Sequence, residues 1–175
     1  PMCTPFSLLQ NLSKDKGDIE YKKSLLLRGI QHIKFCIQLY WHQVENNRYF
    51  LHEHPQYATS WKLPEMIKLL EHPSVQRVQG HMCFYGMKSR DDKGEGLVKK
   101  PTGWATNSPF IAEQVSQQCM NRWSANKHRH VQLMSGRAKA AEVYPVKLCL
   151  AILKGLRNQF IHDGILNLGV IGTVC

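Results

Sequence analysis

The sequence lacks the features that mark disulfide-rich secreted proteins and membrane proteins. Its six cysteines are spread along the chain without a Cys-x-x-Cys pair, which favours free thiols in a reducing compartment over a disulfide framework. No stretch is long and apolar enough to span a bilayer, and the first residues contain no apolar run of signal-peptide length. Internal repeats and low-complexity segments are absent as well. We therefore expect an intracellular protein, nuclear or cytoplasmic, without a membrane partner.

Acidic residues are scarce compared with basic ones. The chain of 175 residues contains 13 Asp+Glu and 23 Lys+Arg, which gives a formal net charge of +10. This excess is typical of proteins that bind polyanions, most simply nucleic acid. The length and a hydrophobic fraction of 43% favour one domain with a hydrophobic core. Because the chain begins at Pro1 without an initiator methionine, we expect it to be a segment of a longer protein.

Helical and strand patterns alternate along the chain. Apolar residues spaced by three and four predict a long helix from Asp18 to about Val44, with Asp18 as its N-cap. Strands are predicted at 48–54, 75–86 and 98–109, a polar turn at 89–96, and further helices at 60–72, 108–119 and 144–160. This alternation predicts an α/β fold in which helices pack on a sheet.

Two potentially reactive side chains stand in the first third of the sequence. Cys3 lies in the stretch PMCTPFS, where prolines restrict the backbone, and a thiol reacts only as the thiolate. Glu53 ends the predicted strand 48–54, and ligands of α/β sheets bind at strand ends. The two side chains could therefore face one pocket. The alternative is a packed thiol and a solvated carboxylate.

Histidines and cysteines offer two candidate metal sites. His52 and His54 share one face of the predicted strand, although no third ligand stands near them in the sequence. A second candidate zinc set consists of Cys119, His128, His130 and Cys149. Its spacing matches no standard zinc finger.

Basic residues crowd the same stretch, and we favour nucleic-acid contact there, with no metal. The residues expected to meet phosphates are Arg122, Lys127, Arg129, Arg137 and Lys139. Trp123 lies among them and is suited to stacking on a base.

Four short motifs, taken together, resemble the cytosine-C5 DNA methyltransferases. PMCTPFS resembles the Pro-Cys catalytic loop of that family, and YFLHEHP is similar to its next strand, which ends in a glutamate. HMCFYGM resembles the later aromatic-glycine segment, and AAEVYPVKLCLAI is similar to the start of the C-terminal helix. The four motifs occur in the order of the family. The resemblance implies a partial Rossmann-like methyltransferase sheet with flanking helices.

The resemblance also implies roles for individual residues. Cys3 would attack C6 of a flipped cytosine, and Glu53 would hydrogen-bond the base. Lys100 would add a contact to the base or backbone of the DNA or RNA. Pro1, Val143 and Tyr144 would border S-adenosylmethionine, the methyl donor. The glycine-rich cofactor loop of the family precedes the Pro-Cys loop and is not in this sequence, so cofactor binding would need an upstream half.

By this resemblance, residues 1–160 form a single methyltransferase-like catalytic segment. Residues 106–139 would be a basic, recognition-like insert, and 161–175 are a tail without an assigned role. The match is to a divergent branch, like the methyltransferase-like segments of mobile-element polyproteins. The expected protein is a fragment that is incomplete or inactive as this chain. The alternative is a non-catalytic basic nucleic-acid-binding module.

Overall fold

The computed structural model of the chain describes residues 3–7, 18–121, 123, 125, 127–134 and 137–167. Four α-helices of this part are α2 (Ile19–Glu45), α3 (Pro64–Leu70), α4 (Pro109–Val115) and α5 (Val146–His162). Its strands are β1 (Leu51–Pro55), β2 (Gln76–His81), β3 (Lys88–Asp91), β4 (Gly94–Leu97) and β5 (Pro101–Thr106). Short 3-10 helices are η1 (Thr4–Phe6), η2 (Thr59–Lys62) and η3 (Ala140–Glu142).

The central sheet has three strands in the order β1–β5–β2. β5 is antiparallel to both neighbours, so β1 and β2 run parallel to each other with β5 between them. The segment η2–α3 connects these two parallel strands. The chain thus forms a split β-α-β unit, and the carboxyl ends of β1 and β2 lie at the edge of the sheet where β5 begins.

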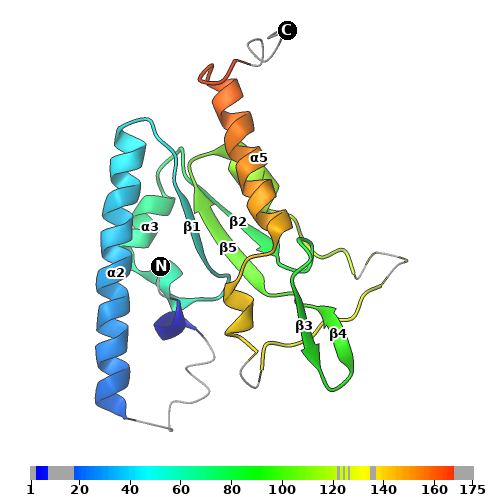
Figure 1. Cartoon of the computed structure of the whole chain (residues 1–175). Helices are drawn as coiled ribbons and strands as arrows, with labels where there is room; N and C mark the ends of the chain where they lie inside the picture. The colour runs from blue at the N-terminus through cyan, green and yellow to red at the C-terminus, as the bar shows by residue number, and fades with distance from the viewer. Residues whose placement is uncertain are drawn as a thin grey trace, which may run out of the picture.

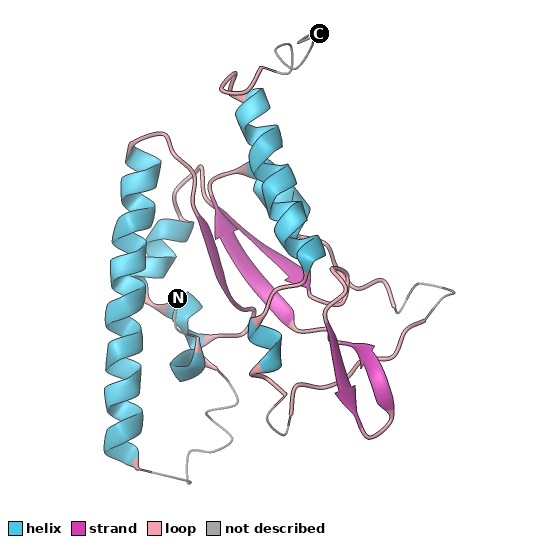
Figure 2. Cartoon of the chain, in the orientation of Figure 1, coloured by secondary structure: helices cyan, strands magenta, loops and turns pink. Residues whose placement is uncertain are grey.

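Helices cover both faces of this sheet (Figures 1 and 2). Adjacent residues of β5 show the two sides. Ala105 packs with Ile33 of α2 and Leu69 of α3, whereas Trp104 packs with residues of α4 and α5. The expected α/β class with flanking helices is therefore confirmed. The observed sheet is small and all of its strand pairs are antiparallel, and its correspondence to a Rossmann-like sheet stays a prediction.

The long helix α2 begins and ends close to where its sequence predicts. The Asp18 carboxylate accepts a hydrogen bond from the Glu20 main-chain N–H at 2.8 Å, as expected of an N-cap. Ile33 and Ile37 on its apolar stripe are buried. Asn47, with a φ of 53°, reverses the chain after the last turn.

Three expected elements differ in the structure. The polar turn 89–96 is instead the hairpin β3–β4, in which Gly94 adopts a φ of +98°. The strand expected at 75–86 ends at His81, because the next residues fold into a turn that Gly86 closes with a φ of +83°. The helix expected at 108–119 ends at Val115, where the side chains of Ser116 and Gln117 hydrogen-bond the Glu113 carbonyl.

The helix expected at 60–72 is divided. Its first part is η2, and α3 begins only at Pro64, because proline fits the first turn of a helix and not its interior. The strand expected at 98–109 is also shorter, since β5 covers Pro101–Thr106 and Ser108 becomes the N-cap of α4.

Candidate functional site

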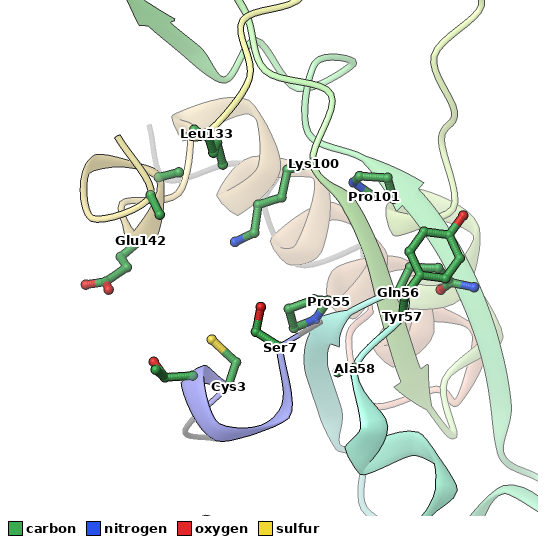
Figure 3. A pocket seen from close by; sticks show the side chains of 13 residues that line it. Cys3, Ser7, Pro55, Gln56, Tyr57, Ala58, Lys100, Pro101, Leu133 and Glu142 are labelled. Carbon is green, nitrogen blue, oxygen red and sulfur yellow. The ribbon is translucent and has the colours of Figure 1, made fainter. Parts of the chain in front are cut away.

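A cavity of about 430 Å³ lies at the carboxyl end of β1, beside the start of β5. This is the edge of an α/β sheet at which ligands usually bind. Figure 3 shows Cys3 and Ser7 from the η1 segment on one side of the cavity and Lys100 on another. The lining residues are Cys3, Thr4, Ser7, Pro55, Gln56, Tyr57, Ala58, Lys100, Pro101, Leu133, Ala138, Ala141 and Glu142.

The residues that follow Cys3 anchor it to the core. Phe6 is 2% exposed, and its main-chain N–H donates to the Cys3 carbonyl at 3.0 Å. Pro5 packs so closely on α2 that a Cβ at Gly29 would lie 2.6 Å from the Pro5 ring. The short motif therefore fixes Cys3 at the rim of the sheet, and its sulfur points into the cavity (Figure 3).

Lys100 links the cavity to Glu53. The Lys100 Nζ lies 3.8 Å from the Glu53 Oε1, and about one fifth of each side chain is exposed. Glu53 itself does not line the cavity, and its Oε1 is buried without a hydrogen bond from any described residue. A carboxylate oxygen in this state can still accept a hydrogen bond from a ligand.

Tyr144 closes the same region from the segment before α5. Burial raises the pKa of its phenol far above the usual value, and the Glu53 carboxylate and Cys3 contribute in the same direction. The structure thus brings together four residues that the sequence analysis singled out: Cys3, Glu53, Lys100 and Tyr144. Val143 does not line the cavity, and 77% of it is exposed. Pro1 lies outside the described residues.

The basic residues expected to contact phosphates differ in their surroundings. Lys127 is exposed, and so is Lys139, which pairs with Glu142 at 3.1 Å. Arg129 instead donates two hydrogen bonds to the Asp91 carboxylate, at 2.8 and 2.9 Å, and one to the Gly94 carbonyl. Arg137 donates to the Gln132 carbonyl at 3.1 Å. Arg122 lies outside the described residues.

His52 and His54 belong to the core. Both are 0% exposed; His52 shares a hydrogen bond with the Tyr40 hydroxyl at 3.0 Å, and His54 shares one with the Ser60 hydroxyl at 2.6 Å. Burial and the neighbouring His54 lower the pKa of His52 to about 2. In the part of the chain that is described, no third metal-ligating side chain joins the pair.

The structure brings together three members of the second candidate metal set and replaces the fourth. Cys119, His128 and His130 converge, but the fourth member is Cys83, whereas Cys149 is exposed on α5. Sequence reasoning missed Cys83 because it stands 36 positions before Cys119 and was assigned to a strand.

Comparisons with protein-family models, curated proteins and solved structures found no match to this chain. Among the described helices, none combines the length and the apolar character that crossing a membrane requires.

Proposed function

We propose that this chain belongs to a cytosine-C5 methyltransferase-like protein that acts on nucleic acid, with Cys3 as its nucleophile. The observation that carries the proposal is the convergence of Cys3, Lys100 and Glu53 beside one cavity at the carboxyl end of β1. The cavity of about 430 Å³ is large enough for a single pyrimidine base, and pockets for small ligands have volumes of about 300–1,000 Å³.

The proposed step is addition of the Cys3 thiolate to C6 of the base. The sulfur–carbon bond forms as the electron pair of the C5=C6 double bond moves towards C5, which then takes up a proton or an electrophile. Elimination of the C5 hydrogen and of the cysteine restores the aromatic ring. The Glu53 Oε1 accepts a hydrogen bond from the exocyclic amino group of cytosine once the Lys100 side chain moves aside. Lys100 then pairs with a phosphate or with the negative charge that develops on the base.

S-adenosylmethionine supplies the methyl group in the family that the sequence resembles. The described residues do not by themselves fit this cofactor, because Val143 is largely exposed and does not line the Cys3 cavity. Tyr144 is half-buried with its ring 6.4 Å from that of Trp104. No step is therefore derived through the cofactor, and the proposal concerns only the addition that this chain's own residues support.

Exchange of the C5 hydrogen tests this addition without a methyl donor. A single-stranded oligonucleotide that carries tritium at C5 of cytosine is incubated with the protein, and tritium released to water is measured. We expect release by the unmodified protein and by Cys149→Ser, an exposed-thiol control, and no release by Cys3→Ser. Absence of release from the unmodified protein, or equal release by Cys3→Ser, contradicts the proposal.

The exposed Lys127 and Trp123 favour a second candidate, a nucleic-acid-binding module without catalysis. The same oligonucleotide distinguishes the two proposals. Binding that weakens strongly with salt, is unchanged by Cys3→Ser and is not accompanied by tritium release supports the module.

A further inference from the structure

We propose that Cys83, Cys119, His128 and His130 bind a structural zinc ion. Each residue offers one ligand atom, and these four atoms all lie within 4.8 Å of one another. Two thiolates and two imidazoles are a common ligand set of structural zinc sites, in which four protein ligands surround the ion as a tetrahedron. The site is separate from the Cys3 cavity, since none of its four ligands lines that cavity.

The separations of the Cys119 sulfur from the two histidine nitrogens fit a tetrahedral ion. The Cys119 Sγ lies 3.5 Å from the Nε2 of His128 and 3.5 Å from the Nε2 of His130. Zinc bonds of about 2.3 Å to sulfur and about 2.0 Å to nitrogen predict sulfur–nitrogen separations of about 3.5 Å. The two Nε2 atoms lie 2.9 Å apart, slightly closer than the roughly 3.3 Å that the same bond lengths predict.

Hydrogen bonding among these four groups is a weak alternative. Both histidines present Nε2 to the same point, and in a pair of neutral imidazoles only one of the two facing nitrogens can carry the proton of the shared hydrogen bond. Thiols are weak donors and weak acceptors, so the sulfur atoms gain little from this arrangement. A divalent cation instead accepts a lone pair from all four atoms at once, with both thiols as thiolates.

Contacts that do not involve a metal ion hold the ligands in place. Cys83 lies in the turn after β2, and His130 forms a bridge with Leu97 at the end of β4. The main-chain N–H of Cys119 donates to the Nδ1 of the buried His81 at 2.8 Å. Three segments remote in the sequence thus meet here through contacts that are independent of the metal, as expected of a preformed site.

The chemistry of the ligands favours zinc over other common cations. Thiolate and imidazole select against calcium and magnesium, which bind oxygen ligands. With four protein ligands the coordination sphere is closed, so the ion has no open position for a substrate water and its role is structural. The ion would fasten the turn after β2 to the 119–130 segment.

Metal analysis of the intact chain, purified under reducing conditions with zinc present, tests the site. We expect about one zinc ion per chain, and after chelation we expect stoichiometric cobalt binding with the visible bands of tetrahedral coordination and a thiolate charge-transfer band. Cys119→Ser and His130→Gln should lower the zinc content to a small fraction of that value. Cys149→Ser and His32→Gln, which change exposed residues outside the cluster, should leave it unchanged.

A second measurement does not depend on whether the variants fold. In the unmodified protein, zinc should protect Cys83 and Cys119 from alkylation, whereas Cys149 reacts with or without zinc, as peptide mass spectrometry can show. No zinc in the reduced protein, octahedral cobalt without a charge-transfer band, or a Cys83–Cys119 disulfide under reducing conditions would each overturn the proposal. Equal protection of Cys149 from alkylation by zinc would also overturn the proposal.

Discussion

The side chain of Asn121 hydrogen-bonds both the main-chain N–H and the main-chain carbonyl of His128. The Asn121 Nδ2 donates to the His128 carbonyl at 2.7 Å, and the His128 N–H donates to the Asn121 Oδ1 at 2.7 Å. This paired contact joins Asn121, two positions after Cys119, to the first histidine of the cluster, seven positions further along the chain. The Asn121 amide thus satisfies both main-chain hydrogen-bonding groups of His128, as a neighbouring strand would in a sheet. The contact helps to place the His128 ring beside Cys119.

Asn121→Ala should weaken metal binding without removing a ligand. The loss of both hydrogen bonds leaves His128 free to move, and supporting residues of this kind typically change metal affinity by about 10–100-fold. Competition with a chromogenic zinc chelator measures the change. Lys127→Ala, an exposed substitution in the same segment, is the matched control and should leave zinc affinity unaltered. An unchanged affinity in Asn121→Ala would show that the paired contact does not position His128.

Removal of zinc should lower the stability of the folded chain. A ligand that binds only the folded state, present at about 1,000 times its dissociation constant, adds about 4 kcal/mol to the free energy of unfolding. We therefore expect chelation to lower Tm by several degrees at least, and added zinc to restore it. Thermal unfolding followed by circular dichroism checks this expectation. Cys119→Ser provides the control, because its Tm should no longer respond to the chelator.

Acid should destabilise the protein through His52. Its pKa is lowered to about 2 by burial and by His54, whereas an unfolded histidine titrates near about 6.5. Between these values only the unfolded chain binds the proton, so the free energy of unfolding decreases as pH falls, by up to about 1.4 kcal/mol per pH unit. The stabilising contribution is thus complete above about pH 7 and is lost progressively below it.

The measurement is urea unfolding between about pH 7 and about pH 5, with chelator present so that metal release does not contribute. His52→Asn should flatten the pH dependence, whereas His32→Gln, a change at an exposed position of α2, should leave it as in the unmodified protein. An equal slope in His52→Asn and in the unmodified protein would contradict the assignment of the effect to His52.

Gly155 permits the close approach of α5 to α4. A Cβ at this position would lie 2.7 Å from the Ile111 Cα and 2.8 Å from the Phe110 carbonyl oxygen, both of which belong to the backbone and cannot rotate away. Overpacking of this kind costs about 1–3 kcal/mol, and alanine regains at most about 1 kcal/mol of helix propensity. Gly155→Ala should therefore destabilise the protein in chemical denaturation. Lys154→Ala, next to it on the exposed side of α5, should have little effect.

The elements with strong local signals could be predicted from sequence, and those that depend on distant partners could not. The sequence of α2 has a capping aspartate and a regular apolar stripe. In the structure the aspartate caps the helix and residues of the stripe are buried. The β3–β4 hairpin was missed because its strands KSRD and GEGL are polar and short, so the alternation that identifies a strand is absent. Its position depends instead on Arg129, which reaches it from 38 residues away in sequence.

In the candidate sites, too, the features with local sequence signals could be predicted, and those that depend on distant residues could not. The proximity of Cys3 and Glu53 to one cavity follows the rule that ligands bind at strand ends, but the position of Lys100 beside Glu53 required the register of β5 against β1. For the cysteine and histidine cluster, the sequence offered three ligands close together. It gave no means of choosing Cys83 over Cys149, because that choice is made by the turn after β2.

Lys127 and Arg129 should differ in their effect on nucleic-acid binding, although both belong to the basic segment. Lys127 is exposed, whereas Arg129 is bound to Asp91 and Gly94. Each phosphate contact of a single strand contributes about 0.7 to the slope of the logarithm of affinity against the logarithm of salt concentration. Lys127→Ala should therefore reduce this slope by about 0.7, measured by fluorescence anisotropy with a labelled single-stranded oligonucleotide. Arg129→Ala should leave the slope unchanged and lower Tm, because it removes the contact that orders the hairpin. A reduced slope in Arg129→Ala with an unaltered Tm would mean that its guanidinium leaves Asp91 to bind phosphate.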